Sequence, residues 1–200
     1  MIKNIFPVIE GLDGSGKSAQ AELLVSFLES IGKDVIRTKE QTADSEAGLK
    51  IKKILLGEIT VDPLELQKLF VQDRKEHLEN QIIPALEDGK FVVCERYATS
   101  TVAYGTSENL DIDLLVKMND NFLLPDLTII LDVSPDSCIK RINFRNGKEE
   151  LFEKKEKLSK AAKIYKKIPG IYENVYVVDG EKEIIGVFEE IKTIVEEKIL

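Results

Sequence analysis

The sequence predicts a single α/β domain with a five-stranded parallel sheet and helices on both faces of the sheet. Short apolar runs alternate with amphipathic stretches of helical period, which is typical of strands joined by crossover helices. A glycine-rich segment follows the first apolar run, where such a sheet turns from a strand into a helix. The chain has no linker composition, internal repeat or low-complexity segment, so we expect residues 1–200 to form one domain.

The first half of the chain is expected to hold three strands. Residues 5–9 are apolar, as in a strand buried on both faces, and Pro7 marks the first rung because proline cannot donate to the sheet ladder. Residues 17–31 place apolar side chains at helical spacing, and Gly32 is positioned to end that helix. Further elements are expected as a strand at 34–38, helices at 47–56 and 63–86, and a strand at 91–94. Pro63 suits the first turn of its helix.

The second half is expected to complete the sheet. Apolar runs at 127–133 and 175–178 predict the fourth and fifth strands. Amphipathic stretches predict helices at 111–122, 135–145, 151–167 and 183–199. A helix therefore stands between each predicted strand and the next, as parallel strands require.

The composition is that of a globular protein and excludes several classes. Hydrophobic residues make up 43% and charged residues 32% of the chain, which argues against disorder. No apolar run approaches the roughly 20 residues of a membrane span, and the N-terminus has no signal-peptide layout. A net charge of −8 argues against sequence-independent binding of nucleic acid. Cys94 and Cys138 lie far apart in or beside apolar segments, so we expect two buried thiols and a cytoplasmic setting.

One glycine-rich motif predicts a triphosphate site. It matches G-x-x-x-x-G-K-[ST] in full, after a predicted strand and before a predicted helix, and consists of Gly11, Leu12, Asp13, Gly14, Ser15, Gly16, Lys17 and Ser18. Its glycines allow backbone N–H groups to turn around an anion, and the helix that follows points its positive end at the phosphates. We expect Lys17 to reach the β- and γ-phosphates of ATP and the Ser18 hydroxyl to bind Mg²⁺.

A second group of residues indicates a kinase. The third predicted strand runs into Glu95 and Arg96, and ligands of an open α/β sheet bind at the carboxyl ends of its strands. Arg96 could hold an acceptor phosphate in a bidentate fork, and Glu95 could reach a metal ion or its water shell. The alternative interpretation is a surface ion pair between these two residues.

These motifs together resemble the thymidylate kinases. The phosphate loop with its preceding Glu10 is similar to theirs. Two further stretches are similar as well: Leu69-Phe70-Val71-Gln72-Asp73-Arg74, and the block from Glu95-Arg96-Tyr97 to Ala103-Tyr104. The similarity continues in the Pro125-Asp126-Leu127 segment and in Arg141 to Arg145 before Phe152-Glu153. The matches occur in the order found in that family and cover residues 5–180. The resemblance implies a kinase that uses ATP and Mg²⁺, with nucleotides as its partners, and a homodimer.

The resemblance also implies roles for single residues. Phe70 would stack on thymine, and Arg74 would hydrogen-bond the edge of the base. The alternative interpretation of Phe70 is a core residue. Arg96 would bind the acceptor phosphate, with Ser100 or Thr101 contacting the nucleotide. Tyr104 would lie where a ribose 2′-hydroxyl projects. Asp13 would help to position the acceptor phosphate or the metal. His77, the only histidine, is interpreted as a packing or surface residue.

A lid is expected at about residues 141–153. This segment contains a polar turn with Gly147 between two predicted helices. The thymidylate kinases carry a catalytic arginine in the phosphate loop or in the lid, and here the loop has Gly14, so Arg145 is our first candidate. Arg141 is expected near the bound ATP. The lysines from Lys154 to Lys167 are interpreted as a solvated helix face.

Two features depart from the family pattern. Its T-R-E-P stretch is replaced by Thr38-Lys39-Glu40-Gln41, followed by residues 42–45, and the proline that would make a rigid turn is missing. The aspartate before Arg96 is replaced by Glu95. Both changes lie near the acceptor side of the expected site.

We therefore expect transfer of the ATP γ-phosphoryl group to dTMP. One alternative is a kinase of another nucleoside monophosphate, such as dUMP or UMP. Another is a P-loop ATPase or switch protein without a small acceptor, which would need a water-positioning residue and a partner surface in place of Phe70, Arg74 and Tyr104.

Overall fold

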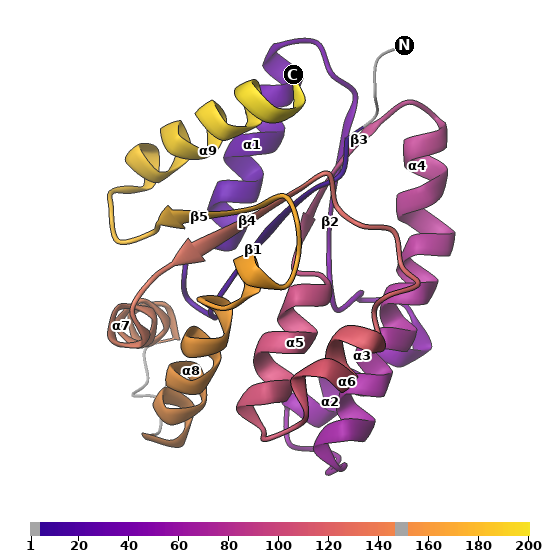
Figure 1. The fold of residues 1–200 in the computed structure, drawn as a ribbon, viewed down its shortest axis with the longest axis vertical. Helices are drawn as coiled ribbons and strands as arrows, with labels where there is room; N and C mark the ends of the chain where they lie inside the picture. Colours follow the sequence, from indigo (N-terminus) through magenta and orange to yellow (C-terminus); the bar gives the residue numbers. More distant parts are fainter. Residues whose placement is uncertain (1–4, 147–151) are drawn as a thin grey trace.

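The computed structural model describes residues 5–146 and 152–200 (Figure 1). Within these ranges one sheet holds the strands β1 Pro7–Gly11, β2 Val35–Lys39, β3 Phe91–Glu95, β4 Leu127–Asp132 and β5 Val175–Asp179. The strand order is β2-β3-β1-β4-β5, and all pairs are parallel. The predicted fold class and all five strands are confirmed, with bounds that differ by one or two residues. Pro7 is the first residue of β1, as expected.

Helices surround this sheet. They are α1 Lys17–Ser30, α2 Glu46–Leu55, α3 Pro63–His77, α4 Ile83–Glu87, α5 Ala98–Ser107, α6 Ile112–Lys117, α7 Pro135–Asn146, α8 Phe152–Tyr165 and α9 Ile184–Ile199, with a π-helical segment η1 Leu78–Ile82 and a 3₁₀ segment η2 Ile168–Gly170. Gly32 ends α1 with a φ of 79° and donates to the carbonyl of Glu29 across 2.9 Å, as predicted.

The two faces of the sheet bury alternate residues of β1 and β3. Phe6 and Val8 pack with Leu78 and Ile82 of the helical run that follows α3. The next residue, Ile9, belongs instead to the cluster that contains the buried residues of α1 and α9. Figure 1 shows α1 and α9 together on one side of the strands, where α1 contacts β1, β2 and β3 and α9 contacts β4 and β5, and it shows α5 and α8 on the other side. This continuous burial explains why the strands appear as unbroken apolar runs in the sequence.

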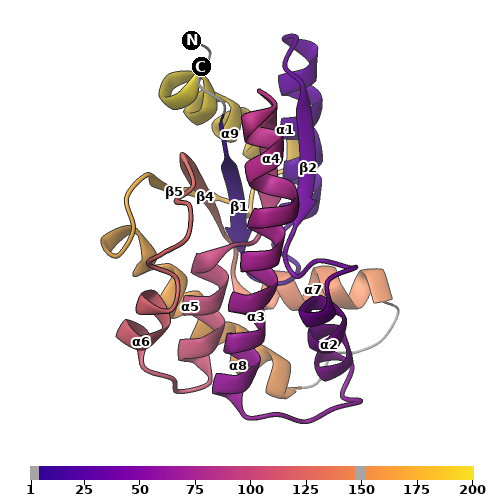
Figure 2. The same ribbon diagram turned by 90° about the vertical axis from the view of Figure 1, so that its right-hand side faces the viewer.

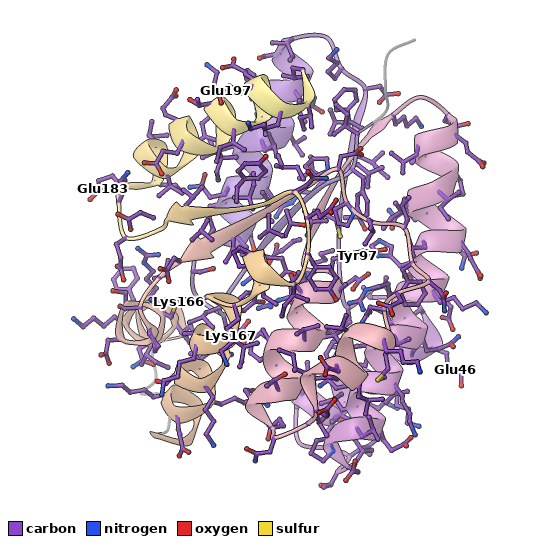
Figure 3. All side chains as sticks on the ribbon, viewed as in Figure 1. Glu46, Tyr97, Lys166, Lys167, Glu183 and Glu197 are labelled. Atoms are coloured by element: carbon purple, nitrogen blue, oxygen red, sulfur yellow. The ribbon has the colours of Figure 1, made fainter. Side chains whose placement is uncertain are left out.

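The helices that frame the site gather at one end of the molecule. Figure 2 shows α2, α3, α5, α6 and α8 at the end opposite to the two termini. Charged side chains are mostly at the surface, and Figure 3 shows Glu46, Glu183 and Glu197 projecting outward while Tyr97 lies in the interior. None of the helices in the described ranges is both long and apolar enough to cross a bilayer. Cys94 and Cys138 are buried and free, as predicted.

Three helix predictions needed correction. The stretch predicted as one helix at 63–86 contains the π-helical segment η1 just before Pro84, which lacks an N–H group and crowds the preceding turn. The helix predicted at 111–122 ends at Lys117. Helix α5 was not predicted, because β-branched residues and Gly105 give it weak intrinsic helix propensity. Gly105 is needed there, since a Cβ would lie 2.7 Å from Leu115 Cδ1.

Candidate active site

The phosphate loop joins β1 to α1 as the sequence predicts. Gly14 and Gly16 have φ values of 82° and 100°, in the left-handed region that favours glycine. The side chain of Lys17 is buried, and its Nζ donates to the carbonyl of Leu12 across 2.7 Å. Burial, together with the charge of Arg96, lowers the pKa of Lys17 to about 8. The loop therefore holds its cation inside the fold, close to the backbone that would surround the phosphates.

The oxygen atoms expected at the metal lie next to each other. Ser18 Oγ donates to Glu95 Oε2 across 2.8 Å. Arg37 lies beside them, since it donates to the carbonyl of Ser18 across 3.1 Å and its Nη2 is 3.9 Å from Glu95 Oε2. A hydroxyl and a carboxylate are oxygen ligands of the kind that Mg²⁺ prefers. The hydroxyl and the carboxylate of this pair fit a Mg²⁺ ion that also binds nucleotide phosphates.

Helix α7 closes the outer side of the phosphate loop. A Cβ on Gly14 would lie 2.6 Å from the carbonyl oxygen of Cys138 and 2.9 Å from Ile142 Cγ1. The loop thus has no room for an arginine at position 14. Arg141 of the same helix donates to the carbonyls of Ser15 and Gly180, across 3.3 and 3.1 Å. Arg141 therefore joins the phosphate loop to the turn after β5.

Arg96 lies between the phosphate loop and α5. Its φ of 70° is unusual for a residue with a side chain, and such strain is concentrated at functional sites. Nη2 pairs with Asp13, and Nη1 donates to Ser100 Oγ across 3.0 Å. The guanidinium carbon lies 5.3 Å from the ring centre of Tyr104, within range of a cation–π interaction. The pair that the sequence suggested between Glu95 and Arg96 does not form, because Glu95 turns to Ser18.

Tyr104 also contacts the phosphate loop. Its hydroxyl accepts a hydrogen bond from the backbone N–H of Asp13 across 3.1 Å. Burial raises the pKa of Tyr104 to about 12, so the phenol is neutral at physiological pH. Tyr104 thereby holds the phosphate loop through its hydroxyl, while its ring packs against the guanidinium of Arg96.

A cavity of about 610 Å³ opens in front of Arg96. Its volume is typical of sites for small molecules. Residues within two positions of the ends of β1, β2 and β3 line it, so it lies at the carboxyl ends of the strands. All the side chains predicted to bind the acceptor line this cavity: Asp13, Phe70, Arg74, Arg96, Ser100, Thr101 and Tyr104. Phe70 is partly exposed in the cavity and belongs to neither core cluster.

Arg74 is the most enclosed of these side chains. It is 1% exposed and donates to Glu40 Oε2 across 2.6 Å. Its Nη1 donates to Thr101 Oγ1 across 3.2 Å and to Asn119 Oδ1. Its guanidinium carbon lies 4.9 Å from the ring centre of Tyr97. Asn119 was not predicted as a site residue, because it has no local motif. Glu40 was noted only as part of the stretch that departs from the family pattern, and both residues come from segments distant from Arg74 in the sequence.

His77 is a packing residue, as one of the two interpretations held. It is buried, and its Nε2 lies 2.6 Å from Thr38 Oγ1. Its Nδ1 is 3.5 Å from Glu40 Oε1. His77 therefore packs against Glu40, whose carboxylate pairs with Arg74.

The segment that departs from the family pattern is fastened to α3. Asp73 is fully buried and accepts hydrogen bonds from Thr42 N across 2.9 Å, and from Thr42 Oγ1 and Ser45 Oγ across 2.5 Å each. Ser45 Oγ also accepts the N–H of Gly48 and caps α2. These contacts fix the segment without the expected proline and place Glu40 at the cavity.

Glu10 is a site residue that sequence reasoning did not identify. It is fully buried, and its Oε1 accepts the backbone N–H groups of Tyr97 and Ser100 across 2.7 and 3.1 Å. Its Oε2 accepts the hydroxyls of Ser100 and Tyr165 across 2.7 and 3.0 Å. The sequence does contain a signal for Glu10, which is an acidic residue directly after the apolar run of residues 5–9. A carboxylate buried at that position requires hydrogen-bond donors from other parts of the fold.

The lid prediction lies largely outside the described residues. The backbone of Arg145 is in the last turn of α7, but its side chain and residues 147–151 are not described. The role of Arg145 stays a prediction. In α8, Lys157 differs from the solvated lysines expected there, because it lines the cavity and pairs with Glu108 of α5 across 2.5 Å.

Comparison with known proteins agrees with the site. Residues 9–191 match the family model described as thymidylate kinase. The chain is 35% identical over 204 residues to a probable thymidylate kinase of Pyrococcus horikoshii, covering 100% of this chain and 99% of the relative. It is 37% identical over 182 residues to a thymidylate kinase of Leptospira interrogans, covering 90% and 88%. It is 33% identical over 204 residues to a thymidylate kinase of Caldicellulosiruptor saccharolyticus, covering 98% of each. The chain belongs to the thymidylate kinase family.

Proposed function

We propose that this chain transfers the γ-phosphoryl group of ATP to dTMP, giving dTDP and ADP. The observation that carries the proposal is the position of Arg96. Its guanidinium lies within hydrogen-bonding distance of the phosphate loop at Gly11 and Asp13, and it also lines the 610 Å³ cavity. A cation that touches both sites can hold an acceptor phosphate next to the γ-phosphate.

The donor side is the phosphate loop. Lys17 would bind the β- and γ-phosphates, and Arg141 would support the loop from the side of α7, where it joins Ser15 to Gly180. Ser18 and Glu95 would hold Mg²⁺, with Arg37 balancing the charge of Glu95. When bound, Mg²⁺ neutralises charge on the phosphates.

The acceptor side is the cavity. Phe70 would stack on the base, and Tyr104 would occupy the space next to the sugar 2′-position. Arg74 is held by Glu40, Thr101 and Asn119 with its charge balanced, and it can only donate hydrogen bonds. A donor at this position favours thymine and uracil, which present a carbonyl at C4, over cytosine, which presents an amino group.

Catalysis would consist of positioning and charge stabilisation. An oxygen of the dTMP phosphate forms a bond to the γ-phosphorus, and the bond from that phosphorus to the bridging oxygen breaks, so that ADP leaves with the electron pair. No covalent enzyme intermediate is needed. Lys17, Arg96 and the lid residue Arg145 would spread the charge of the transferring group.

Steady-state kcat/KM across a panel of acceptors tests this proposal. We expect dTMP to be best, followed by dUMP and then UMP, with dCMP and purine monophosphates poor. The dTMP to dCMP ratio should be about 10-fold or more, as a mismatched buried hydrogen bond costs about 1–3 kcal/mol. Preference for UMP or dCMP would contradict the acceptor assignment. ADP release that is independent of every acceptor would indicate an ATPase.

A cytoplasmic location and a homodimer are also proposed. The two buried free thiols support a reducing compartment, and the dimer rests on the family resemblance alone. Sedimentation velocity of the purified protein would show whether a dimer forms, and fractionation of cells would show the compartment.

A further inference from the structure

A buried chain of hydrogen bonds runs from Arg96 to helix α8. Arg96 Nη1 donates to Ser100 Oγ across 3.0 Å, and Ser100 Oγ donates to Glu10 Oε2 across 2.7 Å. The hydroxyl of Tyr165, the last residue of α8, donates to the same Oε2 across 3.0 Å. Tyr165 and Glu10 are 4% and 0% exposed, so water does not compete for the hydrogen bond between them.

The carboxylate at the centre of this chain is fixed by the backbone. Glu10 Oε1 accepts the N–H groups of Tyr97, which directly follows the strained residue Arg96, and of Ser100 in the first turn of α5. Glu10 Oε2 therefore has a defined position. Because the Ser100 hydroxyl donates to this oxygen, its lone pairs remain to accept the hydrogen bond from Arg96 Nη1. The Tyr165 hydroxyl donates to the same oxygen and lies 3.1 Å from Ser100 Oγ, so it helps to hold Ser100 in place.

Tyr165 supports Arg96 by a second route. Burial raises the pKa of Tyr165 well above its ordinary value, so its hydroxyl keeps its proton and donates it. Its ring meets the ring of Tyr104 edge-on, with the centres 6.4 Å apart. Tyr104 in turn carries the guanidinium of Arg96 on its face.

Helix α8 carries Tyr165 at its end and also reaches the 610 Å³ cavity. It begins at Phe152, within the segment predicted as the lid, and it packs along α5. Near its start, Lys157 pairs with Glu108 of α5 at the cavity, and at its end Tyr165 reaches Glu10. Both ends of the described part of α8 are thus tied to elements of the acceptor site.

We infer that Tyr165 is a positioning residue of the acceptor site, through which α8 sets the orientation of the Arg96 guanidinium. The inference rests on the proposed function, in which Arg96 binds the acceptor phosphate. Tyr165 itself does not line the 610 Å³ cavity, so it acts through Ser100, Glu10 and Tyr104. Loss of its hydroxyl should weaken acceptor binding and leave the phosphate loop unchanged.

The first experiment compares two variants that each lose one phenolic oxygen. In Tyr165→Phe we expect the KM for dTMP to rise about 5- to 10-fold, as for the loss of one hydrogen bond to a charged group, with the KM for ATP changed less than about twofold. Tyr172→Phe is the matched control, because the Tyr172 hydroxyl is buried and has no hydrogen-bond partner among the described residues. Equal KM values for dTMP in the two variants would overturn the inference.

A double-mutant cycle separates positioning from general stability. If Tyr165 acts through Arg96, Tyr165→Phe should change the KM for dTMP less than about twofold in an Arg96→Ala background. Full additivity of the two changes would mean that Tyr165 only supports the fold, and would overturn the inference. If Tyr165→Phe does not fold, Glu10→Gln takes its place in the cycle, with the same criterion.

An error in the proposed function can be distinguished from an error in the inference about Tyr165. A wild-type chain that does not phosphorylate dTMP would contradict the acceptor assignment. The Tyr165 comparison would then use the acceptor that the wild type phosphorylates fastest, and an unchanged KM for that acceptor would overturn the inference on its own.

Discussion

The guanidinium of Arg74 and the carboxylate of Glu40 form a hydrogen-bonded ion pair of 2.6 Å, with side chains that are only 1% and 2% exposed. This pair joins α3 to the segment after β2, and it lines the acceptor cavity. Taking two charges out of water is unfavourable unless they remain paired. The pair therefore makes the shape of the cavity depend on the segment that departs from the family pattern.

The first prediction concerns this ion pair. Glu40→Gln should lower the free energy of unfolding by about 3–5 kcal/mol, because it leaves Arg74 buried without its counter-charge. The measurement is equilibrium unfolding in urea. Glu65→Gln is the control, since Glu65 also pairs with a cation, Lys68, across 2.5 Å but is 57% exposed, and it should cost about 0–1 kcal/mol. Equal losses in the two variants would contradict the role of burial.

Arg96 is the subject of the second prediction. Arg96→Ala should raise the KM for dTMP by at least about 50-fold, since it removes a charged, forked donor from a phosphate dianion. The dissociation constant of ADP, measured by calorimetry, should change little because the phosphate loop donors remain. An unchanged KM for dTMP would mean that Arg96 serves only its pair with Asp13.

The third prediction is that the affinity for ADP depends on pH through the protonation of Lys17. Because burial lowers its pKa to about 8, the free enzyme loses the Lys17 proton as the pH rises through about 8, and the cation that meets the phosphates disappears. Below that pH the affinity for ADP should be flat, and above it the affinity should fall, approaching tenfold per pH unit. Calorimetric titrations with ADP between pH 6.5 and 9.5 measure this.

Lys17→Arg is the control for this pH series. Arginine stays protonated throughout the range, so the variant should bind ADP more weakly but with a flat profile. A flat profile in the wild-type chain would show that Lys17 titrates well above pH 9.

The fourth prediction separates two arginines of α7. Arg145→Ala should lower kcat by about 100-fold or more while the KM for dTMP changes little, because a lid arginine acts mainly in the transition state. Arg141→Ala should mainly raise the KM for ATP, because Arg141 joins the phosphate loop to the turn after β5. The opposite assignment of the two effects would give the catalytic role to Arg141.

The last prediction tests how the segment after β2 is held. Gly48→Ala should destabilise the chain by about 1–3 kcal/mol and raise the KM for dTMP, since the new Cβ would lie 2.3 Å from the carbonyl oxygen of Thr42 and 2.9 Å from Asp73 Oδ1. Gly170→Ala is the control, because a Cβ there meets no atom within 4 Å. Thermal unfolding and steady-state kinetics measure both. A Gly48→Ala variant with wild-type kinetics would show that the segment does not shape the cavity.

Local patterns in the sequence could predict most of the fold and, within the site, the phosphate loop. Apolar runs marked β1 to β5, and the spacing from Gly11 to Ser18 marked the phosphate loop. Helix α5 could not be predicted in this way, because its residues have weak helix propensity and its stability comes from packing against α8, α6 and α3.

The sequence by itself determined the sheet, the phosphate loop and the family, and its resemblance to that family indicated the side chains from Phe70 to Tyr104 that line the cavity. The strands and the phosphate loop each depend on spacing within a short segment, which backbone geometry converts directly into position. Only the tertiary structure decided the partners: Tyr165 meets Glu10 across 155 positions of chain, and Arg74 meets Asn119 across 45. Burial forces such charged and hydroxyl groups to find hydrogen-bond partners, and which partner is within reach is set by how the helices pack on the sheet.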